Sequence, residues 1–285
     1  MAGSSGTWLG DAGVFHGEGA YWDARLGALR YVDMLRGDVL TLRDGGVTRT
    51  NVSEVVALIR PRIAGGYVVA TERGFALLDE ELVVEREIPV FDDPLLRMNE
   101  GACDMNGRLY CGSLAYDYRS GAGTLYRLDP DLTVHVAWEN VTIPNGLVWG
   151  DGGTTALHAD TADRAVYRYE FDPREGTLGS REVFLDLADA PGSPDGMALD
   201  AEGGLWVALW GGRAVHRYDA AGALTETIRV PVTNPTSCAI GGENGTTLFV
   251  TTSRQGLADR DEEGAGRVYS VDIGVTGAPV HAFGA

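Results

Sequence analysis

Residues 193–209 read SPDGMALDAEGGLWVAL, and related sequences recur along the whole chain. Most copies place an acidic or amide residue next to glycine, then a polar turn, then a short apolar segment such as LWVAL. Short apolar segments rich in Val, Leu, Tyr and Trp between Gly, Asp and Asn turns are typical of β-strands. The repeated unit therefore predicts strands joined by tight turns rather than helices.

The apolar segment of this unit occurs six times at a regular interval. Its copies start 38 to 49 residues apart, and most are followed by a turn and a second strand-like segment. The six copies are residues 29–33, 67–71, 109–113, 156–160, 205–209 and 248–252. An interval of this length is typical of propeller blades. We predict an all-β fold, a six-bladed β-propeller with four antiparallel strands per blade, which takes up residues 1–285 as a single domain.

Two other all-β architectures also repeat short strands. A β-helix has a much shorter repeat than this one, and a pair of β-sandwiches does not space its strands so regularly. The propeller is therefore the preferred prediction.

The innermost strand of each propeller blade lines the central channel, so equivalent positions on different blades converge near one axis. Counting back ten or eleven residues from the six segments gives Glu18, Ala57, Asn99, Asn145, Asp195 and Cys238. Four of these residues carry a carboxylate or an amide, and glycine follows each of the four within two positions. Such hard oxygen donors suit one divalent metal ion, Ca²⁺, Mg²⁺ or Mn²⁺, with Zn²⁺ tolerated. Asn-Gly and Asp-Gly also form ordinary turns, so a water-filled channel without metal is the alternative.

Composition limits the partners and the location that we expect. The chain has 23 basic and 41 acidic residues, and a formal net charge of −18 repels both nucleic acid and anionic membranes. It has no segment resembling a signal peptide, and no apolar run approaches the ~18 residues of a membrane span. Cys103, Cys111 and Cys238 cannot all pair, so we expect reduced cysteines in a cytoplasmic protein. We expect a monomer, because no long apolar edge stands out.

Several segments keep a characteristic order and spacing. They are residues 17–19 before Trp22, 97–101 before 104–109, 145–147 before Trp149, 194–197 before 200–208, and 236–238 before 248–252. Together they resemble the regucalcin (senescence marker protein) and gluconolactonase family of six-bladed propellers, which are metal-dependent lactonases. The resemblance covers essentially the whole chain, and its specificity comes from the set rather than from any one segment.

This resemblance implies a metal site, a substrate site and a reaction. The implied ligands of one divalent metal ion are Glu18, Asn145 and Asp195. The implied substrate-binding residues are Arg97, Asn99 and Glu100. The reaction is hydrolysis of a small lactone by a metal-activated water, in particular of a sugar lactone such as gluconolactone or a pentonolactone, as part of carbohydrate metabolism. We expect Asp195 to be the catalytic residue, since a carboxylate beside the attacking water can accept its proton as a general base.

Other chemistries are less well supported. The chain has no Gly-x-Ser-x-Gly, His-Glu-x-x-His or Gly-x-x-x-x-Gly-Lys motif. An organophosphate hydrolase and a non-catalytic metal-binding propeller remain alternatives, whereas the oxygen ligands argue against a metal-free, strictosidine-synthase-like propeller. His16 is a candidate for orienting Glu18, and His158 is interpreted as a strand residue. Residues 114–119 are expected to lie over the channel mouth, where substrate choice is made.

Overall fold

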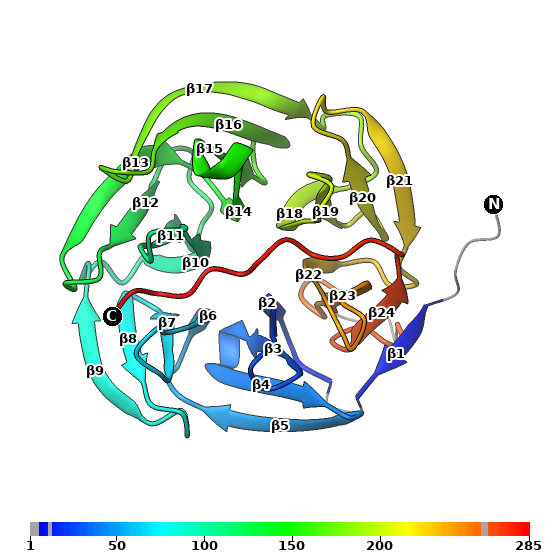
Figure 1. The fold of residues 1–285 in the computed structure, drawn as a ribbon, viewed down its shortest axis with the longest axis horizontal. Coiled ribbons are helices and arrows are strands. Elements are labelled where there is room, and N and C mark those ends of the chain that lie inside the picture. The colour runs from blue at the N-terminus through cyan, green and yellow to red at the C-terminus, as the bar shows by residue number, and fades with distance from the viewer. Residues whose placement is uncertain (1–5, 11–12, 258–261) are drawn as a thin grey trace.

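The structure, a computed structural model, describes residues 6–10, 13–257 and 262–285. In this part of the chain the strands form six four-stranded antiparallel sheets, arranged as blades around a central channel (Figure 1). The predicted six-bladed β-propeller is therefore confirmed.

In every blade the strands follow one another from the channel outward. Blades 1 to 3 are β2 (Gly17–Asp23), β3 (Ala28–Asp33), β4 (Asp38–Arg43) and β5 (Gly46–Asn51); β6 (Val56–Pro61), β7 (Tyr67–Thr71), β8 (Gly74–Leu78) and β9 (Val84–Pro89); and β10 (Leu96–Cys103), β11 (Leu109–Ala115), β12 (Gly123–Leu128) and β13 (Val134–Val141). Blades 4 to 6 are β14 (Pro144–Gly150), β15 (Thr155–Asp160), β16 (Ala165–Asp172) and β17 (Thr177–Asp186); β18 (Ser193–Leu199), β19 (Leu205–Trp210), β20 (Ala214–Tyr218) and β21 (Leu224–Arg229); and β22 (Pro235–Gly241), β23 (Thr247–Thr252), β24 (Val268–Asp272) and β1 (Thr7–Leu9).

Helical structure is minor. The described residues contain the 3₁₀ helices η1 (Met34–Arg36) and η2 (Asp151–Gly153). None of the helices in this part of the chain has the length and apolar character needed to cross a membrane.

Burial explains which segments of the repeat are easiest to recognise in the sequence. The second strand of a blade packs against neighbouring blades on both faces, and β3 is buried along its whole length. The outermost strands face solvent on one side and carry charges; in β9, only Ile88 is buried. A strand buried on both faces has a continuous apolar sequence, which is the signal that defined the repeat.

The last blade is completed from the other end of the chain. β1 pairs antiparallel with β24, with Thr7 opposite Ser270 and Leu9 opposite Val268. This pairing joins the N-terminal segment to the C-terminal blade and so closes the ring. Because β1 is three residues long and stands outside the repeat, it was not predicted from the sequence.

The inner strands share one irregularity near the channel. In β18, Pro194 pairs with Leu209 and Met197 with Val207, so Asp195 and Gly196 together lie opposite one residue. β10, β14 and β22 have the same two-against-one bulge, and β2 and β6 have a register shift close to it. A bulge turns a side chain away from the regular sheet, as often happens beside functional sites.

The register corrects one of the six axial positions obtained by counting. In β22 the bulge holds Thr236 and Ser237, and Cys238 follows it, paired with Val250. The count failed because the hairpin of blade 6 is longer: Ile240 pairs with a residue eight positions later, Leu248, whereas Leu199 of blade 5 pairs with Leu205, six positions later. Thr236, not Cys238, is therefore the axial residue of blade 6.

Candidate active site

The four axial residues with oxygen-bearing side chains come together at one end of the channel. Asn99, Asn145 and Asp195 lie in the bulges of their strands, and Glu18 lies directly before the register shift of β2. All four are buried, none being more than 5% exposed. Because each lies in the first half of an inner strand, they share the end of the channel at which these strands begin.

Hydrogen bonds orient the two amides. Arg97 Nη1 donates to Asn99 Oδ1 at 2.6 Å, and Asn99 Nδ2 donates to Asn145 Oδ1 at 3.1 Å. Asn145 Nδ2 donates in turn to Thr161 Oγ1 at 2.6 Å. This chain turns the Asn145 amide oxygen toward Asn99 and its nitrogen away. Thr161, which fixes this orientation, was missed from the sequence because it lies outside the repeated polar-glycine pattern.

Glu18, Glu100 and Asp195 form a buried acidic cluster. Burial, followed by repulsion from Asp195 and Glu100, raises the pKa of Glu18 well above its usual value. Burial, followed by repulsion from Glu100, does the same to the pKa of Asp195, and burial also raises the pKa of Glu100. Carboxylates crowded in this way require protons or a cation to remain together.

The acidic cluster fits a divalent cation. Asp195 Oδ1 is buried without a hydrogen-bond partner, which suits an atom reserved for a ligand. Glu18, Asp195 and the amide oxygen of Asn145 supply the hard oxygens that such cations prefer. Among the residues that the structure describes, no three His, Cys, Asp or Glu side chains are grouped as a metal site. The candidate ligand set instead combines two carboxylates with an amide.

His16 lies beside this cluster but does not hydrogen-bond to Glu18. Its Nε2 is 3.9 Å from Glu18 Oε1, and its Nδ1 is 2.8 Å from Ser253 Oγ. Burial, followed by repulsion from Arg97, lowers the pKa of His16 to about 3, which makes the ring neutral near pH 7. A neutral imidazole held by Ser253 packs against Glu18 without adding charge to the site.

The loop predicted to cover the channel mouth contacts the site through two exposed tyrosines. Tyr116 donates a 2.6 Å hydrogen bond to Glu72 Oε1, and the Arg97 guanidinium carbon lies 5.9 Å from the centre of the Tyr116 ring. Tyr118 Oη accepts a 3.4 Å hydrogen bond from Gln255 of blade 6. The loop of blade 3 thus reaches a residue of a blade on the other side of the channel.

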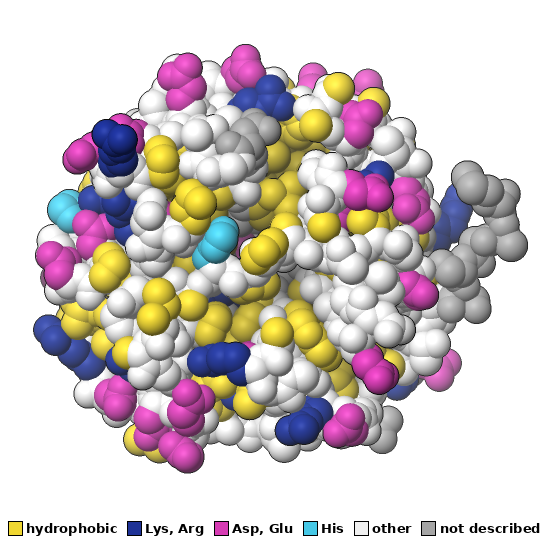
Figure 2. Space-filling model, viewed as in Figure 1, with side chains coloured by type: hydrophobic (Ala, Val, Ile, Leu, Met, Phe, Trp, Pro, Cys, Tyr) yellow, Lys and Arg dark blue, Asp and Glu magenta, His cyan; other side chains and the backbone are white. Residues whose placement is uncertain are grey.

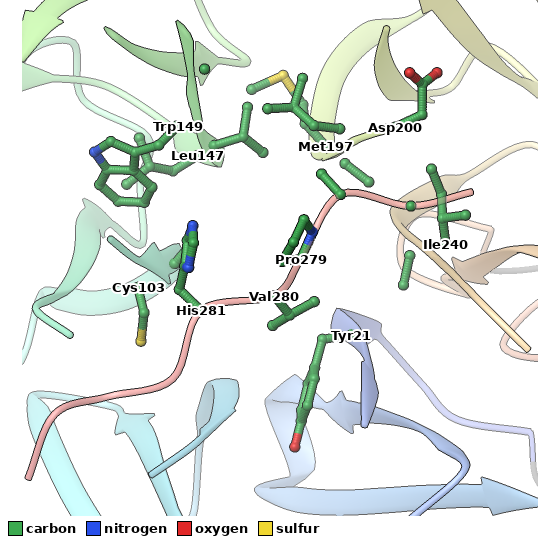
Figure 3. Close-up of a pocket in the computed structure, with 18 of the residues that line it drawn as sticks. Tyr21, Cys103, Leu147, Trp149, Met197, Asp200, Ile240, Pro279, Val280 and His281 are labelled. Carbon is green, nitrogen blue, oxygen red and sulfur yellow. The ribbon is translucent and has the colours of Figure 1, made fainter. Parts of the chain in front are cut away.

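The opposite end of the channel has a different character. The C-terminal segment crosses it, with Ala278 N bonded to Leu199 O at 2.9 Å and Phe283 N to Pro61 O at 2.8 Å (Figure 1). Apolar side chains line the hollows beside this segment, one of which measures about 530 Å³ (Figures 2 and 3). The largely apolar lining gives this end few groups for ester hydrolysis.

His158 is separate from the acidic cluster. It lies in β15 opposite Leu147 and Tyr167, is 1% exposed, and packs edge-on against Tyr169. Its interpretation as a strand residue is therefore correct.

A six-bladed propeller with buried carboxylates and amides at one channel end belongs to a class of channel-centred, oxygen-ligand propellers. The model of the SMP-30/gluconolactonase/LRE-like region matches residues 16–254, and the chain belongs to this family. It is 32% identical to regucalcin of Gallus gallus over 94% of each chain. It is 36% identical to a pentonolactonase of Haloferax volcanii over 67% of each. The solved structure of a calcium-binding protein, regucalcin, from Agrobacterium tumefaciens superposes with a TM-score of 0.91 at 26% identity, covering 99% of both chains.

Proposed function

We propose that this protein hydrolyses a small lactone with the help of one divalent metal ion, Ca²⁺, Zn²⁺, Mn²⁺ or Mg²⁺. The observation that carries the proposal is the burial of Glu18, Asn145 and Asp195 at one channel end, with a carboxylate oxygen of Asp195 left without a partner. The names of the relatives support the reaction class, and the pentonolactonase supports sugar lactones such as a pentonolactone or gluconolactone as substrates.

Glu18, Asn145 and Asp195 would hold the metal ion. When bound there, such an ion polarises the ester carbonyl and lowers the pKa of water. Asp195 accepts a proton from the attacking water as the water oxygen bonds to the carbonyl carbon. The ring C–O bond then breaks, and the proton passes to the departing alkoxide, so the product is the open hydroxy acid.

Three further residues position the lactone. Arg97 uses one nitrogen to hold Asn99, which leaves other guanidinium donors for substrate oxygens. Asn99, fixed between Arg97 and Asn145, sets the direction of approach. Glu100 Oε2 has no hydrogen-bond partner and is free to accept a hydrogen bond from a substrate hydroxyl.

A pH-stat assay tests the proposal. Gluconolactone, xylonolactone, arabinolactone and galactonolactone are each offered to the protein after chelation and again after metal is added back. We expect turnover of at least one lactone that disappears with chelator, returns with metal, and falls roughly 10³-fold in Asp195→Asn, since a general base contributes 10²–10⁴-fold. Arg97→Ala should act mainly on KM.

Other results would assign other functions. Metal binding without turnover of any lactone would identify a non-catalytic metal-binding propeller. Faster hydrolysis of a phosphotriester than of every lactone would identify an organophosphate hydrolase. Lactone turnover that chelation leaves unchanged would contradict the metal-dependent mechanism.

The setting of the reaction is part of the same proposal. Three free, buried cysteines suit the reducing cytoplasm. We propose a monomer in which residues 1–285 form one propeller domain, with a small lactone rather than nucleic acid or a membrane as its partner.

A further inference from the structure

Blade 2 gives the acidic cluster no side chain from its axial position. Ala57 occupies the register shift of β6 and has nothing to offer a cation. Three residues further along the same strand lies Arg60, a guanidinium that is only 8% exposed. A buried arginine requires several partners, so its contacts show what it is for.

Arg60 donates hydrogen bonds to backbone carbonyls of three inner-strand residues. Nη1 donates to Gly19 O at 3.1 Å and to Ile59 O at 2.8 Å, and Nη2 donates to Gly101 O at 2.8 Å. Arg60 therefore joins β6 to β2 and β10 on either side. These bonds leave the guanidinium little freedom to turn.

The same guanidinium faces the carboxylate of Glu100. Arg60 Nη2 lies 3.6 Å from Glu100 Oε1, and the Gly101 N–H donates to the same oxygen at 3.1 Å. The other oxygen, Oε2, is buried without a hydrogen-bond partner. Glu100 also lies close enough to Glu18 and Asp195 to raise the pKa of both. One oxygen of Glu100 is thus held by Arg60, and the other is free beside the candidate metal ligands.

Little else restrains Glu100 from behind. Arg60 also lines the apolar hollow at the far end of the channel, together with Leu147, Met197 and Cys238 (Figure 3). Apolar side chains around a hollow supply no charge to replace the guanidinium. Arg60 is therefore the cation that keeps Glu100 paired on the side away from the site.

We propose that Arg60 is a positioning residue that holds Glu100 back from the metal ion, so that Glu18, Asn145 and Asp195 are the only protein ligands. This inference rests on the proposed function. A catalytic metal keeps coordination positions open for water and substrate, whereas a structural site is closed by protein ligands. A third carboxylate, free to turn, would fill one of those positions and bind the cation more tightly at the expense of turnover.

Arg60→Met tests this proposal through the sign of the change in metal affinity. The metal-stripped full chain is titrated with Mn²⁺ by calorimetry, and lactone turnover is measured at saturating Mn²⁺. We expect Mn²⁺ to bind at least about tenfold more tightly, equivalent to ~1.4 kcal/mol, while kcat falls at least about tenfold. Adding Glu100→Gln to Arg60→Met should return the affinity to within about threefold of the unaltered protein.

Arg30→Met is the matched control. Arg30 is also buried, at 5% exposure, but it contacts Tyr67 and Asp23 rather than the acidic cluster. Its replacement should lower stability and leave Mn²⁺ affinity within about threefold. A purely structural role for Arg60 would weaken Mn²⁺ binding rather than strengthen it.

Three results would overturn the inference. Equal or weaker Mn²⁺ binding by Arg60→Met is the first, and failure of the double variant to reverse tighter binding is the second. The third comes from Glu100→Gln alone, which serves if Arg60→Met does not fold: a large loss of Mn²⁺ affinity would mean that Glu100 is already a ligand. No Mn²⁺ uptake by the unaltered protein would instead overturn the metal site of the proposed function.

Discussion

His158 and Asp195 both bury polar atoms that lack hydrogen-bond partners, but their surroundings give these atoms different meanings. Neither ring nitrogen of His158 has a partner, and the ring packs between strands of blade 4. Asp195 Oδ1 faces other acids at the channel. An unpartnered carboxylate among acids suits a cation, whereas an unpartnered imidazole in a packed blade only costs stability.

The cost at His158 depends on pH in a defined direction. Burial is the main cause that lowers the pKa of His158 to about 4, from 6.5. Between these two values the unfolded chain binds more protons at this residue than the folded chain. Stability from the neutral ring is therefore complete above pH 6.5 and is lost as the pH falls toward 4.

We predict that His158→Leu removes this acid sensitivity. Chemical denaturation of both proteins from pH 7 to pH 4 should show the unaltered protein losing ~3 kcal/mol more than the variant, from 1.36 kcal/mol per pKa unit. At pH 7 the variant should be as stable or more stable, because it buries no unpartnered nitrogen. Parallel pH profiles for the two proteins would show that His158 does not titrate as its burial implies.

At the scale of the strands, the bulges depend on glycines that approach the next blade. A Cβ on Gly146 would lie 2.7 Å from Met197 N and 2.8 Å from Asp195 O. The bulge of β14 is thus packed directly on the bulge of β18. Glycine beside each axial residue therefore serves contact between blades as well as turn formation.

We predict that Gly146→Ala displaces the bulge of β18 and weakens the metal site. Overpacking of this kind costs ~1–3 kcal/mol in unfolding free energy, and Mn²⁺ affinity should fall with it because Asp195 moves. Gly46→Ala in the exposed strand β5 is the control, since a Cβ there meets only Arg43 O at 3.6 Å. Unchanged Mn²⁺ affinity in Gly146→Ala would separate the glycine contact from the geometry of the site.

How far the sequence predicts this molecule also depends on its elements. Doubly buried second strands such as β19 carry a continuous apolar signal, so the repeat and the six blades were predicted correctly. The axial residues followed where hairpins have equal length, and the prediction failed at Thr236 because one hairpin is longer. Arg60 was missed because it approaches from behind an axial alanine, and side chains that converge from different strands leave no local pattern.

At the scale of the whole molecule, the channel separates two environments that one chain must hold in a closed ring. Acids and amides occupy one end, and apolar hollows crossed by the C-terminal segment occupy the other. The candidate metal ligands come from blades 1, 4 and 5, whereas the ring closes in blade 6. Stability of the closure and geometry of the site are therefore separable by mutation.

We predict that deleting residues 1–10, which include β1, destabilises the ring without removing the metal site. The deletion removes the pairing of β1 with β24 and the edge-on contact of Trp8 with Tyr269, whose ring centres are 5.1 Å apart. Thermal unfolding should show Tm lower by at least ~5 °C, because 1 kcal/mol corresponds to roughly 2–4 °C in a domain of this size. The exposed edge of β24 should also make the variant aggregate sooner on heating.

Trp8→Ala separates packing from strand pairing and should account for only part of the fall in Tm. Mn²⁺ affinity at 25 °C should stay within about threefold in both variants, since the closing strand touches none of the proposed ligands, and one factor of ten would already be ~1.4 kcal/mol. A large loss of affinity would show that ring closure sets the distances among Glu18, Asn145 and Asp195. An unchanged Tm would show that the three inner strands of blade 6 hold the ring closed without β1.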